Sequence, residues 1–190
     1  YNRFSEKDLE DYEYILKSKD MATSEEVWKS YPVPDEASTE IFNRIYKKRF
    51  KRWNEDLKID NKIKNVLFLR PTLGFLIKYF NKNTNLNMYF LEISIISSKM
   101  IKKNYPNVTE LEGSIHGIYK GDFLKKENFF DLIVSNHHLL HCYNAEDTFK
   151  KLKSLLKYDG QIIFTDEIIV KPWNPFHYYF WDEKMFYKIL

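Results

Sequence analysis

From Asn65 onward, short apolar runs alternate with stretches of helical periodicity, and this alternation constrains the fold more than any other feature of the 190-residue sequence. The runs span Val66–Leu69, Met88–Leu91, a weaker stretch Val108–Glu112, Asp131–Ser135 and Gln161–Thr165. Continuous apolar strands separated by amphipathic helices are typical of a parallel sheet that helices cover on both faces. Right-handed crossovers then give a doubly wound α/β fold, in which ligands bind at the carboxyl ends of the strands.

The segments between the runs have helical patterns. We predict helices from Leu73 to Phe80, from Ser94 to Asn104 and from about Ala145 to Lys157. The apolar face of the last helix comprises Phe149, Leu152, Leu155 and Leu156. Tyr158-Asp159-Gly160 is then expected to form the turn before the last apolar run.

The first 60 residues are rich in charge and helical in pattern. One helix is predicted from the N-cap Ser5 to about Ser18, and a longer one from about Ala37 to Leu57. The longer helix carries a basic stripe made of Arg44, Lys47, Lys48, Arg49, Lys51 and Arg52. Such a stripe can contact nucleic acid, but the interpretation we favour is the solvated outer face of a packed helix. We therefore divide the chain into an N-terminal helical cap or lid (1–60), an α/β core (61–170) and an aromatic-rich C-terminal segment (171–190).

Composition excludes several classes of protein. Lys and Arg exceed Asp and Glu by 30 − 27 = 3, which by itself does not indicate a nucleic-acid partner. No apolar run approaches the ~20 residues that span a bilayer, so no membrane insertion is expected. The single cysteine, Cys142, cannot form an internal disulfide and favours a reducing, cytoplasmic location.

Three stretches of the α/β core carry a resemblance to a known family. Tyr89–Ser94 has an acidic residue where its strand ends, Phe130–Asn136 forms a strand, and Leu155–Ile163 gives a helix end, a turn and a strand. In order and spacing, residues 60 to 170 resemble the class I S-adenosylmethionine-dependent methyltransferase superfamily. The resemblance implies a Rossmann-like methyltransferase fold, with a mostly parallel sheet, helices on both faces and a helical extension before it. It also implies S-adenosylmethionine as the cofactor.

The glycine-rich loop of this family is degenerate in the sequence. The family pattern is Val-Leu-Asp-Leu-Gly-Cys-Gly-Thr-Gly, and the corresponding stretch is Val66–Gly74. The strand and the final glycine, Gly74, match the pattern. Phe68 takes the acidic position, and Arg70 and Thr72 take the positions of the first two glycines.

The replaced glycines bear on the methionine end of the cofactor, which the Leu69–Gly74 loop lines in the family. Glycine permits a positive φ and a close approach of the backbone to the ligand. We expect Arg70 and Pro71 to prevent both, and Pro71 also lacks an N–H donor. The loop could instead use the Arg70 guanidinium to hold a different anionic ligand.

The resemblance implies further cofactor contacts at the ends of the other strands. Glu92 would hold the ribose hydroxyls, although an acidic residue before a helix also interacts favourably with the helix dipole. The adenine would be read by Ser114 or, alternatively, by Asp122 after a longer loop. The cofactor-binding residues are thus expected to be Leu69, Arg70, Thr72, Gly74, Glu92, Ile93, Ser114, Ile115 and Asn136.

Three histidines follow the fourth strand, and one of them is a candidate general base. His137, His138 or His141 could take a proton from a substrate hydroxyl or amine as that atom attacks the methyl sulfonium. The alternative is that the three are structural. No second Cys or His cluster is present in the sequence, so we expect no metal site.

The last 20 residues are dense in aromatic side chains, which suit a substrate lid, an interface or core packing equally. The family fold continues into two more strands, so we expect the final strands to be missing here. Tyr1 and Leu190 are then cut ends, and a homo-oligomer or a partner chain would cover the sheet edge at the aromatic segment.

The functional prediction is an S-adenosylmethionine-dependent methyltransferase that acts on an O or N atom of a small molecule. The alternative is a catalytically inactive relative that serves as a scaffold or binding domain with a remodelled cofactor loop. An RNA-associated methyltransferase, suggested by the basic stripe, ranks third, and we expect no nucleic-acid partner.

Overall fold

The structure is a computed structural model that describes residues 40, 43–44, 47–48, 51, 62–71, 74–82, 85–92, 94–113, 121–136, 142 and 145–165. Its centre is a five-stranded sheet with the order β3-β2-β1-β4-β5. The strands are β1 (Asn65–Leu69), β2 (Asn87–Leu91), β3 (Thr109–Glu110), β4 (Phe130–Asn136) and β5 (Leu156–Thr165). Each neighbouring pair is parallel, which confirms the doubly wound sheet predicted from the apolar runs.

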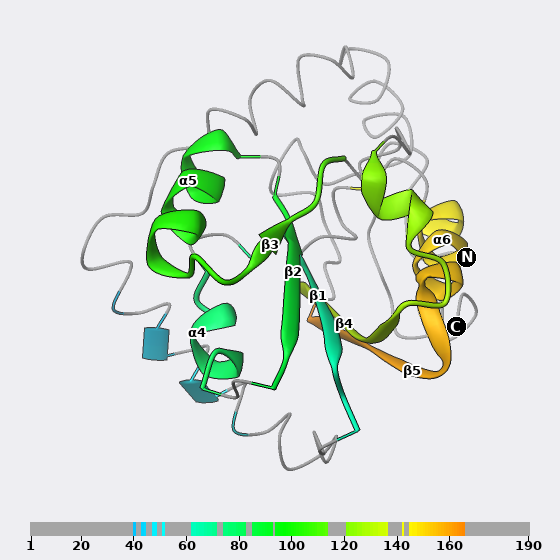
Figure 1. Cartoon of the computed structure of the whole chain (residues 1–190), viewed down its shortest axis with the longest axis horizontal. Helices are drawn as coiled ribbons and strands as arrows, with labels where there is room; N and C mark the ends of the chain where they lie inside the picture. The colour runs from blue at the N-terminus through cyan, green and yellow to red at the C-terminus, as the bar shows by residue number, and fades with distance from the viewer. Residues whose placement is uncertain are drawn as a thin grey trace, which may run out of the picture.

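Helices cover both faces of this sheet (Figure 1). They are α4 (Ile77–Phe80), α5 (Ile95–Asn104), the 3₁₀ helix η1 (Asp122–Lys125) and α6 (Ala145–Leu155). On one face, Val66 and Phe68 of β1 are buried with Phe80 of α4 and Ile101 of α5. On the other face, the alternate β1 residues are buried with the η1 residue Phe123 and with Leu152 of α6. Because consecutive side chains of a strand point to opposite faces, an uninterrupted apolar strand fills both cores.

The last helix and the last strand meet earlier than the sequence predicts. Helix α6 ends at Leu155 and β5 begins at Leu156, so the expected turn at residues 158–160 lies within β5. The register there jumps: Leu156 is opposite Phe130, whereas Gln161 is opposite Leu132. The bulge tightens at Gly160, where an added Cβ would lie 2.9 Å from the carbonyl oxygen of Phe130. Glycine is therefore required at this close backbone approach.

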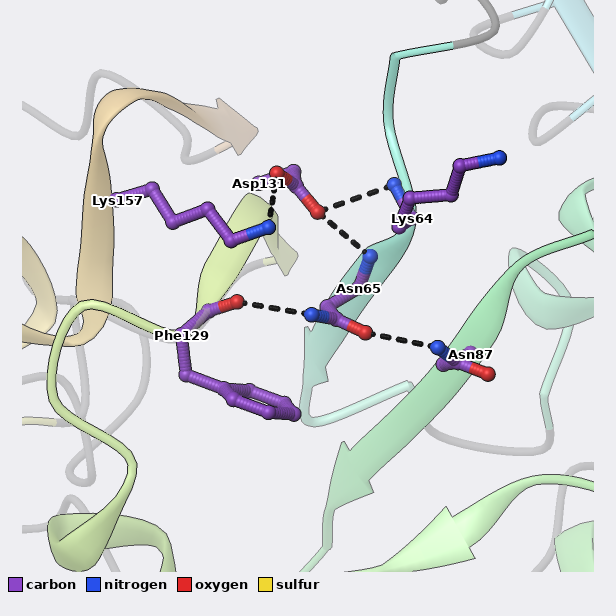
Figure 2. A network of polar contacts seen from close by, with 6 residues as sticks. All are labelled: Lys64, Asn65, Asn87, Phe129, Asp131 and Lys157. Atoms are coloured by element: carbon purple, nitrogen blue, oxygen red, sulfur yellow. Dashed lines mark hydrogen bonds and ion pairs between the residues drawn. The ribbon is translucent and has the colours of Figure 1, made fainter.

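A network of polar side chains joins the starts of four strands; we call it the amino-edge network (Figure 2). Asp131 Oδ2 accepts hydrogen bonds from the N–H groups of Lys64 (3.0 Å) and Asn65 (2.8 Å). Its Oδ1 accepts one from Lys157 Nζ at 2.7 Å. The Asn65 amide donates to the carbonyl oxygen of Phe129 at 3.0 Å, and Asn87 Nδ2 donates to Asn65 Oδ1 at 2.9 Å. One carboxylate and one amide thus link β1, β2, β4 and β5.

The described part of the N-terminal segment is helical and lies beside α4 (Figure 1). Its residues Glu40, Asn43, Arg44, Lys47, Lys48 and Lys51 agree with the helix predicted over 37–57. The Tyr79 hydroxyl of α4 donates a hydrogen bond to the carbonyl oxygen of Asn43 at 2.9 Å. Burial raises the pKa of Tyr79 above its ordinary value of 10.0. The helix predicted from Ser5 to Ser18 and the segment 171–190 lie outside the described residues.

Candidate functional site

Parallel pairing aligns the carboxyl ends of β2, β1 and β4. Leu69 at the end of β1 is opposite Leu91 of β2 on one side and Ser135 of β4 on the other. One residue further on, the chain places Glu92, Arg70 and Asn136 in a row, which we call the carboxyl-edge row. The sheet order reverses between β1 and β4, since β2 and β3 lie to one side and β4 and β5 to the other. Ligands of open α/β sheets bind in the crevice at such a switch point.

Arg70 adopts a left-handed backbone conformation, with φ +50°. The expectation that an arginine would prevent a positive φ at this position is therefore wrong. The Arg70 N–H donates to the carbonyl oxygen of Leu91 at 2.9 Å, which continues the β1–β2 pairing and fixes the start of the turn. A left-handed conformation costs an L-residue roughly 1–2 kcal/mol. Such strain occurs preferentially at functional sites, where the surrounding structure enforces it.

The turn closes at Gly74, the final glycine of the motif. Its N–H donates to the carbonyl oxygen of Pro71 at 2.9 Å, and its carbonyl oxygen accepts from the Lys78 N–H at 3.0 Å. Gly74 has φ +79°, and an added Cβ would lie 2.8 Å from Cε2 of Tyr105. Glycine is therefore required here both for the turn and for the approach of the ring that follows α5. These turns delay α4 to Ile77, later than the predicted start at Leu73.

Glu92 follows β2 directly and is half-buried. Its Oε1 accepts a hydrogen bond from the Ser94 N–H at 3.0 Å. Ser94 is the N-cap of α5, and its own hydroxyl accepts from the Ser97 N–H at 3.3 Å. The role of Ser94 in orienting Glu92 was not predicted, although the Glu-x-Ser spacing at a helix start is the signal for it.

The backbone at Gly121 lies against the backbone at Glu112, two residues after the end of β3. An added Cβ on Gly121 would lie 2.0 Å from the carbonyl oxygen of Glu112, so the backbones touch there. Residues 114–120 lie between these two points and outside the described part of the chain. Gly113 and Gly121 precede the two alternative adenine-reading residues, Ser114 and Asp122, in the sequence, and the backbones of these two glycines lie together.

Several residues predicted for the site lie outside the described part of the chain. They are Thr72, Ile93, Ser114, Ile115, His137, His138 and His141. Those predictions therefore stay predictions, as does the lid role of the N-terminal segment. Within the described residues, no group of three His, Cys, Asp or Glu side chains could hold a metal ion. In the same residues, no helix is long and apolar enough to cross a membrane.

Comparison with known proteins agrees with the fold. Residues 72–164 match the model of a family described as a methyltransferase domain. The fold is similar to that of CurJ carbon methyltransferase, with 13% identity, a TM-score of 0.58, and 90% of this chain and 50% of that one covered. A Bacillus halodurans C-125 protein assigned as a methyltransferase gives 13% identity, a TM-score of 0.56, and coverage of 71% and 64%. An S-adenosylmethionine-dependent methyltransferase from Mesorhizobium loti has 14% identity and a TM-score of 0.51, and the match covers 60% of this chain and 53% of that one.

The chain matches only part of each of these solved structures. The chain spans 50% to 64% of the length of these three solved structures. No curated protein is significantly similar to it in sequence. The family match and the strand order nevertheless agree with each other. The fold that the resemblance implies is confirmed, and residues 72–164 match a family described as a methyltransferase domain.

Proposed function

We propose that this domain binds S-adenosylmethionine at the carboxyl edge of the sheet and transfers its methyl group to an O or N atom of a small molecule. The observation that carries the proposal is the carboxyl-edge row, in which Glu92, Arg70 and Asn136 follow three adjacent strands at the switch point. Adjacent strands lie about 4.8 Å apart, so the row spans roughly 10 Å, the scale of a nucleoside with its substituent.

The residues in the row fit such a ligand. The Glu92 carboxylate suits the two hydroxyls of a ribose, because it accepts several hydrogen bonds at once. The left-handed turn at Arg70 keeps the backbone course that a glycine would give at the end of β1. The cofactor supplies a methyl group activated by a sulfonium. The chain then has to orient the acceptor atom and remove its proton.

Proton removal is proposed for one of His137, His138 and His141, which follow Asn136 at the end of β4. A histidine has an ordinary pKa of about 6.5, so a neutral imidazole is available to act as a base near neutral pH. The imidazole would accept the proton of a hydroxyl or amine as that atom attacks the methyl carbon. This step needs an acceptor held in line with the bond that breaks.

A second candidate function is a binding domain without catalytic activity. The observation that favours it is Pro71, which is buried in the turn after β1 and has no N–H to offer a ligand. Calorimetric titration with S-adenosylmethionine and with its demethylated product, S-adenosylhomocysteine, separates the two functions. Binding of both ligands supports the methyltransferase. A folded sample that binds neither overturns it and leaves the second function.

The position of the ribose is tested by Glu92→Ala. Losing hydrogen bonds to a charged acceptor costs about 1.5–3 kcal/mol, so the affinity for either ligand should fall about tenfold to a hundredfold. The matched control is Glu127→Ala, which removes an exposed carboxylate that pairs with Lys151 of helix α6. Equal affinities for the two variants would show that the ribose does not contact Glu92.

A further inference from the structure

The two helical layers of the domain differ strongly in charge. On the side of α4 and α5, the described residues of segments 40–51, 74–82 and 94–110 include nine cationic side chains and two anionic side chains, those of Glu40 and Glu110. Glu110 forms an ion pair with Lys102. The nine cationic residues are all exposed: Arg44, Lys47, Lys48, Lys51, Lys78, Lys82, Lys99, Lys102 and Lys103. We call these nine residues the basic face. The excess of cationic side chains in this layer is 9 − 2 = 7.

The opposite layer is nearly neutral. In segments 121–129 and 145–155, five lysines stand against four acidic residues, an excess of 5 − 4 = 1. Ion pairs bind Lys150 to Glu146 at 2.8 Å and Lys151 to Glu127 at 3.2 Å. The small net charge of the whole chain thus conceals an asymmetry between the two helical layers among the described residues.

The three segments that carry the basic face are neighbours in the fold. Helices α4 and α5 lie side by side on one face of the sheet, and the described N-terminal residues lie beside α4 (Figure 1). The hydrogen bond from Tyr79 to Asn43 fixes this N-terminal segment against α4. Lysines near helix C-termini are stabilised by the helix dipole, which accounts for Lys102 and Lys103. The dipole does not account for the stripe from Arg44 to Lys51.

We propose that the basic face binds the phosphodiester backbone of a nucleic acid. A dense field of Lys and Arg neutralises successive phosphates and releases their counterions, which is the dominant source of affinity for such a strand. Exposed amides at the ends of α4 and α5 supply further neutral donors to phosphate and sugar: Asn81, Asn85, Asn104 and Asn107. This surface is therefore distinct in chemistry from the carboxyl-edge row, and the proposal does not depend on methyl transfer.

The test is fluorescence anisotropy of the full chain, without cofactor, with a labelled single-stranded RNA of ~20 nucleotides titrated over a range of salt concentrations. The variant Lys78→Gln/Lys99→Gln/Lys103→Gln removes three exposed charges from the basic face. The matched control Lys125→Gln/Lys150→Gln/Lys153→Gln removes three exposed charges from the opposite layer. Circular dichroism melts establish that both variants remain folded.

The original chain is expected to bind with an affinity that falls steeply as salt rises. The basic-face variant should bind about tenfold more weakly at ~0.1 M salt. The slope of the logarithm of the binding constant against the logarithm of the salt concentration should also become less steep by about 2, because each phosphate contact on a single strand contributes ~0.7 to it. The control should change much less. Equal losses in the two variants, or absence of binding at low salt, would overturn the proposal. So would equally effective competition by polyglutamate at the same charge concentration, since the surface would then not select a phosphodiester chain.

Discussion

Replacing Asp131 by Asn tests whether one carboxylate holds the amino edge of the sheet together. The Asp131 side chain is only 16% exposed and accepts from two backbone N–H groups as well as from Lys157. An asparagine keeps a single acceptor oxygen and turns an NH₂ group toward these donors. One backbone bond to a charged acceptor is lost, at about 1.5–3 kcal/mol. The pair with Lys157, whose side chain is 42% exposed, adds at most about 1 kcal/mol.

The variant Asp131→Asn should therefore lower the free energy of unfolding by about 2–4 kcal/mol at neutral pH. In urea this corresponds to a midpoint about 1–2 M lower, for a denaturant slope of about 2 kcal/mol per M. The control is Asp159→Asn, which removes an exposed carboxylate from the bulge of β5 and should stay within about 0.5 kcal/mol. Similar midpoints for the two variants would refute the role assigned to Asp131.

The pH dependence gives a second measurement on the same variant. Burial by itself raises the pKa of Asp131, but hydrogen bonds from Lys157, Asn65 and Lys64 outweigh it, and the net pKa is lowered from the ordinary 3.8. A carboxyl with a lowered folded-state pKa stabilises the fold above its unfolded pKa, and that stability is lost as the pH falls through the folded value. The difference between the original chain and Asp131→Asn should thus shrink below about pH 4. A difference that stays constant on acidification would contradict the mechanism.

Two further predictions concern backbone positions at the carboxyl edge. Gly121 has φ +125°, and Gly121→Ala places a Cβ against the carbonyl oxygen of Glu112. The variant should therefore be destabilised by at least about 2 kcal/mol in a thermal melt. An unchanged melting temperature would contradict the contact. At Arg70, the glycine variant should be more stable than the alanine variant by about 1 kcal/mol, because both lose the guanidinium and only glycine relieves the left-handed strain. Urea unfolding of the Arg70→Gly and Arg70→Ala pair checks this, and a more stable alanine variant would contradict it.

The fold was predictable because its signal is local. Each apolar run marks a strand, and the rules for parallel crossovers predict a doubly wound sheet, although not the order of its strands. The end of α6 was missed because Leu155 and Leu156 continue the apolar pattern across the boundary between helix and strand. The early start of β5 and the bulge within it depend on pairing with Phe130 and Asp131, about 25 residues earlier in the chain. Periodicity within one segment contains no information about such a partner.

The candidate site was predictable only in part, for a related reason. Glu92 is identified by its place after a strand, which the sequence reveals. The left-handed turn at Arg70 is different, because a tertiary hydrogen bond to Leu91 accompanies a conformation that arginine itself disfavours. Asp131 was likewise not recognised as structural, since its backbone partners Lys64 and Asn65 are 67 and 66 residues away in the chain.

The stabilising residues and the candidate ligand residues lie at opposite edges of the sheet. Strand β1 has five residues, so at about 3.3 Å per residue the amino-edge network and the carboxyl-edge row are roughly 16 Å apart. This separation exceeds both the ~8 Å screening length in physiological salt and the 7–10 Å beyond which substitutions usually act independently. Sheet stability therefore places little constraint on the turn after β1. A chain of this design can carry Arg70 and Pro71 where the family that it resembles has small residues, while the strand order and both cores are retained.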